Sequence, residues 1–87
     1  MIKEKFFNSV TYGKILVTFY RNGEICGRFK MNCVSVDDFD DEIVIYGNEN
    51  ESVILDANEI VSQTDEDDEI EFLFGAAGNQ TGITFLS

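Results

Sequence analysis

The dipeptide Asn22-Gly23 constrains the fold of this chain more than any other feature of its sequence. It lies inside Lys14–Lys30, between two runs of β-branched, aromatic and apolar residues. Asn and Gly both tolerate positive φ, so an Asn-Gly pair between two such runs predicts a β-hairpin with a tight turn. The hairpin can close through Asn22-Gly23 alone or through the three residues 21–23, and the two loops give different strand registers.

Apolar alternation along the two strands favours the longer loop. A two-residue loop would pair Phe19 with Cys26 and Val17 with Arg28, which mixes apolar and charged side chains on one face. A three-residue loop with Gly23 as a left-handed bulge gives one apolar face instead. Its pairs are Phe19 with Ile25, Val17 with Gly27, and Ile15 with Phe29. We therefore expect the three-residue loop, because a one-residue slip would exchange the buried and exposed sides.

Short β-type runs follow the hairpin at regular intervals, with no proline and no long amphipathic helical pattern. Such spacing is typical of small antiparallel barrels and sandwiches. The sequence therefore predicts an all-β fold, a single small barrel domain over residues 1–87. Residues 1–13 fit either a short helical turn across the barrel mouth or a lead-in strand, and Ile60-Val61 is expected to form a tight turn. The strands expected after the hairpin are Met31–Val36, Ile43–Tyr46, Ser52–Asp56, Ile70–Phe74 and Thr81–Leu86.

The second hairpin strand is expected to bend. Its apolar residues fall on odd positions up to Met31 and on even positions at Val34 and Val36. A bulge near Asn32-Cys33 would keep all of them pointing inward and would bend the strand, as small barrels require. The same alternation places Phe29 in the core.

The run GRFKMNCVSVDD…EIVIYGNENESVILDANEIVS resembles Sm-like and SH3-like small barrels in its order of bent strand, strand, hairpin and short turn. This resemblance covers about half of the chain and implies a module that binds another protein or assembles with itself. Sm proteins contact RNA through an Arg/Lys-Gly pair in their second motif. The corresponding stretch here, Ile60-Val61-Ser62, has neither residue. No RNA-binding residue is therefore carried over.

The two cysteines, Cys26 and Cys33, fall on one expected strand. Seven steps of about 3.3 Å separate them by roughly 23 Å, which is beyond the reach of a disulfide. We expect two small, half-buried, reduced thiols and a cytoplasmic protein. The sequence contains no apolar run as long as a membrane span and no signal-peptide pattern.

Charge is divided unequally along the chain, whose net charge is −11. Residues 1–30 contain all six basic residues and two acids, a balance of +4, whereas residues 31–87 contain 15 acids and no base. Such one-sided charge costs stability through self-repulsion, which leaves two explanations: a selected function, or acids that only keep a small barrel soluble. The acids form two clusters, which we take as the candidate partner-binding residues. These residues are Asp37, Asp38, Phe39, Asp40, Asp41 and Glu42 in the first cluster, and Asp65, Glu66, Asp67, Asp68 and Glu69 in the second.

Carboxylates on a rigid β scaffold can imitate the phosphates of a nucleic acid, and Phe39 offers an apolar anchor among them. In charge, size and lack of catalytic groups, the chain is similar to the DNA-mimic inhibitors that phages and mobile elements use against restriction and CRISPR nucleases. That similarity implies a non-enzymatic protein that occupies the basic groove of a nuclease or another DNA-binding protein. It implies no direct binding of nucleic acid or of a membrane.

Several alternatives compete with this interpretation. The exposed hairpin face, Lys14, Thr18, Tyr20, Arg28 and Lys30, could bind single-stranded nucleic acid or the acidic surface of a second copy. The acidic clusters could hold Ca²⁺ or Mg²⁺, although neither matches the EF-hand template. The chain has no histidine, so only carboxylates could act as a base near neutral pH, and we expect neither an enzyme nor a cofactor.

Overall fold

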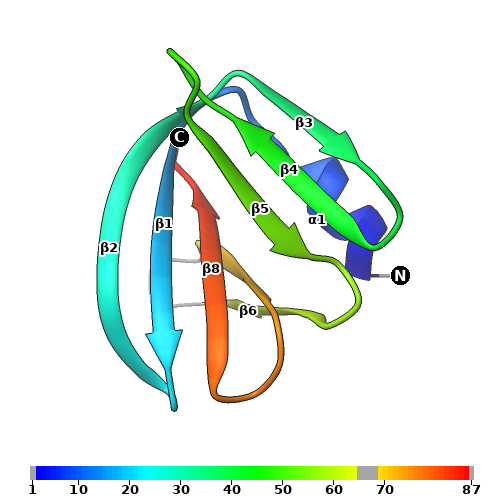
Figure 1. Ribbon diagram of the computed structural model, residues 1–87. Coiled ribbons are helices and arrows are strands. Elements are labelled where there is room, and N and C mark those ends of the chain that lie inside the picture. Colours follow the sequence, from blue (N-terminus) through cyan, green and yellow to red (C-terminus); the bar gives the residue numbers. More distant parts are fainter. Residues whose placement is uncertain (1, 65–68, 87) are drawn as a thin grey trace.

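The computed structural model describes residues 2–64 and 69–86, and this part of the chain forms one short helix and eight β-strands (Figure 1). The prediction of mainly antiparallel β structure is confirmed, because every strand pair in the described residues is antiparallel. The elements are α1 (Ile2–Ser9), β1 (Gly13–Arg21), β2 (Glu24–Cys33), β3 (Ser35–Asp38), β4 (Glu42–Tyr46), β5 (Ser52–Asp56), β6 (Ile60–Thr64), β7 (Ile70–Phe74) and β8 (Asn79–Phe85).

The strands form a five-stranded sheet in the order β2-β1-β8-β7-β6 and a three-stranded sheet in the order β3-β4-β5. The chain passes between the sheets twice, from β2 into β3 and from β5 into β6. Figure 1 shows the two sheets set at an angle, with α1 near the end of β3. No ladder among the described strands joins one sheet to the other. Closure into a barrel therefore stays a prediction.

The hairpin register differs from the one expected. The turn is the two-residue loop, since Arg21 lies opposite Glu24 and both Asn22 (φ 52) and Gly23 (φ 82) have positive φ. A register shift then follows, because Tyr20 lies opposite Ile25 whereas the preceding residue of β1 lies opposite Gly27. The extra residue in β2 at this bulge restores odd-with-odd pairing, so the apolar side chains share a face as expected. The pairs along that face are Phe19 with Gly27, Val17 with Phe29, and Ile15 with Met31.

The chain bends close to the expected position, but by ending β2 at Cys33 and entering the other sheet rather than by a bulge within one strand. β2 ends at Cys33 and β3 begins at Ser35, so Val34 lies at the corner and its amide donates to the Tyr46 carbonyl at 2.8 Å. Val34 is 53% exposed rather than inward, and Val36 packs against the core. The placement of Phe29 in the core is also wrong, because its side chain is 40% exposed.

The core lies between the two sheets, and α1 closes one side of it. Of the two alternatives for the N-terminal segment, the structure has the helix and not the strand. Its centre is Phe6, which is fully buried and makes edge-to-face contacts with Phe72 and Phe74. An isolated helix of eight residues is not stable in water. Burial of Phe6, with Ile2 and Phe7 packed around it, therefore stabilises α1.

The second expected turn is also different, because Ile60 and Val61 open strand β6. This strand pairs with β7, placing Ile60 opposite Phe74 and Val61 opposite Leu73. Two apolar residues were too short a pattern to indicate a strand by themselves. The pairing with β7 provides the backbone hydrogen bonds that the local sequence did not indicate.

The cysteines lie in one strand, β2, and both are free, so the absence of a disulfide between them is confirmed. Their environments differ from the half-buried positions expected. Cys26 is exposed, whereas Cys33 is buried and its burial raises the pKa of its thiol.

Candidate binding surface

The first acidic cluster is a tight turn between two strands rather than one continuous loop. Asp37 and Asp38 belong to β3 and Glu42 begins β4, which leaves Phe39, Asp40 and Asp41 as the turn. The Phe39 amide donates to the Glu42 carbonyl at 2.9 Å, and Asp40 takes a positive φ of 64°. The Asp40 amide donates to the Asp38 carboxylate at 3.0 Å, so one acid of the cluster shapes the turn that carries the others.

Lys3 of α1 holds this turn against the rest of the molecule. Its ammonium group lies 2.7 Å from the Asp38 carboxylate and donates to the Asp40 carbonyl at 3.2 Å. The hydrogen bond from Lys3 lowers the pKa of Asp38. Asp38 and Asp40 are therefore tied to the fold, while the carboxylates of Asp37, Asp41 and Glu42 pair with no cation in the described part of the chain.

Strand register extends the acidic surface beyond the turn. Glu42 of β4 lies directly opposite Asp56 of β5, and the next row on the same face is Asp37, Val44 and Ile54. Val44 is nearly buried, whereas Ile54 is 64% exposed and Phe39 in the turn is 56% exposed. We call these residues and the adjoining turn the acidic face, although Asp38, opposite the buried Ile43, lies on the other side of β3. The acidic face is defined by Asp37, Asp38, Phe39, Asp40, Asp41, Glu42, Ile54 and Asp56.

Two residues of the acidic face were missed from the sequence, Ile54 and Asp56. They lie more than ten residues beyond the first cluster in a run, SVILD, that looked like an ordinary strand. The available signal was the alternation itself, because Ile54 and Asp56 share one side of that strand. Their proximity to Glu42 depends on the β4–β5 register, which the sequence pattern did not specify.

Of the second acidic cluster, only Glu69 belongs to the described residues. Asp65, Glu66, Asp67 and Asp68 lie outside the described residues. Glu69 is exposed and directly precedes β7. Their part in binding stays a prediction.

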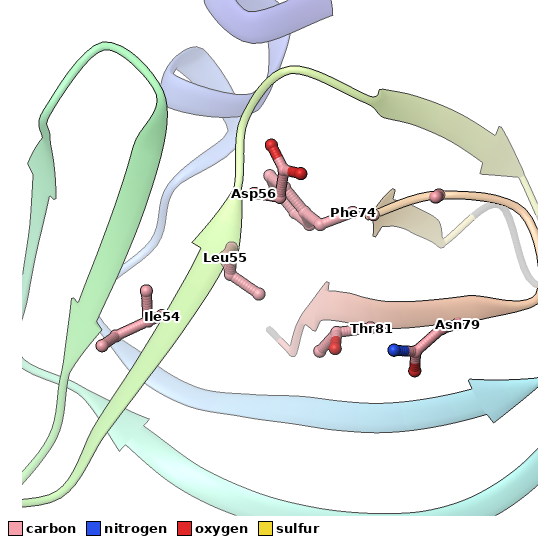
Figure 2. A pocket seen from close by; sticks show the side chains of 8 residues that line it. Ile54, Leu55, Asp56, Phe74, Asn79 and Thr81 are labelled. Carbon is pink, nitrogen blue, oxygen red and sulfur yellow. The ribbon is translucent and has the colours of Figure 1, made fainter.

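The acidic face is hollowed beside its apolar centre. A cavity of about 440 Å³ is lined by Asp41, Glu42, Ile54, Asp56 and Asn58. A second cavity of about 340 Å³ lies on the other side of β5, toward the β7–β8 turn (Figure 2). Ile54 and Asp56 line both, so β5 separates two hollows. Among residues 2–64 and 69–86, no group of three or more His, Cys, Asp or Glu side chains is arranged to hold a metal ion.

The competing hairpin face is less open than the sequence implied. Lys14, Arg28 and Lys30 are exposed, but Thr18 is fully buried and accepts a hydrogen bond from Arg28 Nε at 3.1 Å. The Tyr20 hydroxyl donates to the Glu71 carboxylate, 2.8 and 2.7 Å from its two oxygens. The only aromatic ring of that predicted site is thus hydrogen-bonded within the sheet and partly buried, which does not favour base stacking.

The Tyr20–Glu71 contact gives a pH prediction. Partial burial and the hydrogen bond to Glu71 raise the pKa of Tyr20 from 10.0 to about 12. The folded-state pKa is above the unfolded value, so this contribution to stability is fully present below pH 10 and is lost as the pH rises through 12. In an absorbance titration one of the three tyrosines should ionise late, and Tyr20→Phe should abolish that late step. Tyr12→Phe is the control, and loss of the late step in that variant would contradict the assignment.

Comparison with known proteins finds no match: no family model, no curated protein and no solved structure is similar to this chain. No helix in the described residues is long and apolar enough to cross a membrane.

Proposed function

We propose that this protein is a non-enzymatic acidic binding protein that occupies the basic groove of a nuclease or another DNA-binding protein, as a mimic of nucleic acid. One observation carries the proposal: the β3–β4 turn and the strands beside it carry six exposed carboxylates, together with the exposed apolar side chains of Ile54 and Phe39. In the described part of the chain, Lys3 is the one cation paired with any of the six. The six are Asp37, Asp38, Asp40, Asp41, Glu42 and Asp56.

The spacing of the carboxylates suits a surface that imitates the phosphates of a nucleic acid. Neighbouring strands place opposite residues such as Glu42 and Asp56 about 5 Å apart, and alternate residues of one strand about 7 Å apart. The sheet and the hydrogen-bonded turn fix these positions before binding, so little ordering entropy is lost on association. The charges steer a basic partner toward the face, and the apolar centre supplies contacts that slow dissociation.

The proposal includes a barrel as the scaffold and the cytoplasm as the location of the protein. The two sheets, joined by the corner at Val34, support a small SH3-like or Sm-like barrel as the scaffold that presents the acidic face. The two free thiols support a reducing compartment, the cytoplasm. An inhibitor from a phage or mobile element that acts on a restriction or CRISPR nuclease would work there.

The test removes charge from the acidic face without touching the fold. The set Asp37→Asn, Asp41→Asn and Glu42→Gln changes side chains that make no hydrogen bond or ion pair with described residues. The control set, Glu24→Gln, Glu49→Gln and Glu51→Gln, removes the same number of charges from the two hairpin turns. The partner is first captured from an extract of the native host, and its affinity is then measured with duplex DNA as the competitor.

We expect the first set to weaken binding about 10- to 100-fold, mainly through the association rate, and the control set to change it less than about 3-fold. Phe39→Ala should instead raise the dissociation rate, because its exposed ring would be buried on binding. Binding should weaken steeply with salt, and duplex DNA should displace the protein. Failure of DNA to compete, or equal effects of the two sets, would overturn the proposal.

A further inference from the structure

Strand β5 has a free edge. It pairs with β4 on one side, and no described strand pairs with it on the other. The Gly47 amide donates to the Glu51 carbonyl at 2.8 Å, and the Ala57 amide donates to the Asp41 carbonyl at 2.9 Å, which fixes the alternation of the β4–β5 ladder at both ends. In an antiparallel ladder every second residue bonds to the partner strand, so the backbone groups of Val53 and Leu55 point toward β4. Those of Ser52, Ile54 and Asp56 point to the free edge.

The free edge lies along a groove. The 340 Å³ cavity beside it is lined by Ile54, Leu55 and Asp56 on one side and by residues of β7, β8 and their turn on the other. Figure 2 shows Leu55 of β5 on one side of the groove and Thr81 and Asn79 of β8 on the other. The residues on the β7–β8 side are Phe74, Gly75, Ala76, Asn79 and Thr81.

Uncovered aromatic surface adjoins the groove. Thr81 lies directly opposite Phe19 of β1, and the Phe19 ring stacks on Phe29 of β2 with centroids 5.7 Å apart. These two rings are 38% and 40% exposed, although they lie on the core-facing side of the five-stranded sheet. A segment placed along β5 would therefore lie beside apolar surface that the protein itself leaves uncovered.

The charge beside the free edge of β5 favours a basic strand over an acidic one. Proteins commonly protect a free strand edge with charged side chains, and β2 carries Arg28 and Lys30 on its own free edge. The edge of β5 carries Asp56 instead, with Glu42 directly opposite it on the next strand. Pairing β5 with β5 of a second copy would put a second set of carboxylates on one continuous sheet face, and the repulsion between like charges disfavours it. A basic strand would be attracted.

We infer that β5 accepts an extended basic segment of the partner as an additional strand. The inference rests on the proposed function for the basic character of that partner. Residues of the added strand opposite Ser52, Ile54 and Asp56 exchange backbone hydrogen bonds with them and carry Lys or Arg side chains toward Asp56 and Glu42. The alternate residues lie opposite Val53 and Leu55, and their apolar side chains face the groove. The recognised segment therefore alternates basic and apolar residues.

The probe is the synthetic peptide acetyl-Lys-Val-Lys-Val-Lys-Val-Lys-amide. Two modified versions give a matched pair, one N-methylated at the inner lysines and one N-methylated at the same number of valines. Both modifications remove backbone donors and restrict the chain, but the lysine amides face β5 and the valine amides face away. Binding to the ¹⁵N-labelled protein is followed by the amide shifts and the hydrogen-exchange protection of Ile54 and Asp56.

We expect the unmodified and N-methyl-valine peptides to shift and protect these two amides, and the N-methyl-lysine peptide to bind at least about 10-fold more weakly. Equal binding of the two modified peptides, or no binding of the unmodified one, overturns strand addition. Shifts confined to the turn Phe39–Asp41 also overturn it, while leaving the charge-based function intact. The proposed function fails separately, if duplex DNA does not compete for the captured partner.

Discussion

Replacing Phe6 by alanine is expected to lower the free energy of unfolding by about 3–5 kcal/mol, which is a large part of the stability of a domain this small. Phe6 is fully buried, and its ring centroid lies 5.2 Å from that of Phe72 and 5.1 Å from that of Phe74. The substitution would leave a cavity between α1 and β7, and α1 is too short to stay helical without this contact. The loss should therefore include the packing of the whole N-terminal helix.

Urea unfolding followed by far-UV circular dichroism measures this effect. Phe29→Ala is the matched control, because it removes the same side chain from a position that is 40% exposed. We expect a loss of about 1 kcal/mol there, from partial burial and the stacking on Phe19. Similar losses for the two variants would show that α1 does not close the core.

Gly75→Ala is expected to cost about 2–4 kcal/mol, from backbone strain and steric overlap together. Gly75 has a φ of 108°, a conformation that residues with a side chain rarely adopt. A Cβ at this position would lie 2.7 Å from the carbonyl oxygen of Asn79, which belongs to the backbone and cannot move aside cheaply. The Gly75 amide also donates to the Glu59 carbonyl at 3.0 Å, so a shift of this turn would break the link between the β5–β6 corner and β7.

Gly27→Ala provides the comparison for Gly75→Ala. A Cβ at Gly27 would meet only the edge of the Phe19 ring, at an ordinary contact distance of 3.6 Å. We expect that variant to change the unfolding free energy by less than about 1 kcal/mol. Thermal or urea unfolding of both variants measures the two changes in unfolding free energy. An unchanged stability of Gly75→Ala would contradict the turn geometry described for residues 75–79.

The β1–β2 hairpin separates what the local sequence predicted from what it did not. Asn22-Gly23 correctly predicted a tight turn, and apolar alternation correctly predicted which side chains share a face. The two requirements conflict in a regular hairpin, because a two-residue turn puts Val17 opposite Arg28. The structure satisfies both through a bulge in β2, and nothing in the local pattern said where along the strand that bulge would fall.

The acidic face also combines residues that the sequence predicted with residues that only the fold brings together. The cluster at residues 37–42 was visible in the sequence because its members are neighbours in the chain. Asp56 and Ile54 joined it through the β4–β5 register, and Lys3 joined it by packing of α1 against the end of β3. These are contacts between segments distant in sequence, which composition and spacing do not encode directly.

By itself, the sequence determined the mainly antiparallel β structure, the tight turn at Asn22-Gly23, the bend after Cys33 and the segregation of charge. Each of these depends on residues close together in the chain, where turn chemistry, alternation and counting of charges suffice. Only the tertiary structure decided that Phe6 fills the core while Phe29 remains half exposed, that Ile60 begins a strand, and that β5 keeps a free acidic edge. The physical reason is that burial and strand pairing depend on what the rest of the chain covers.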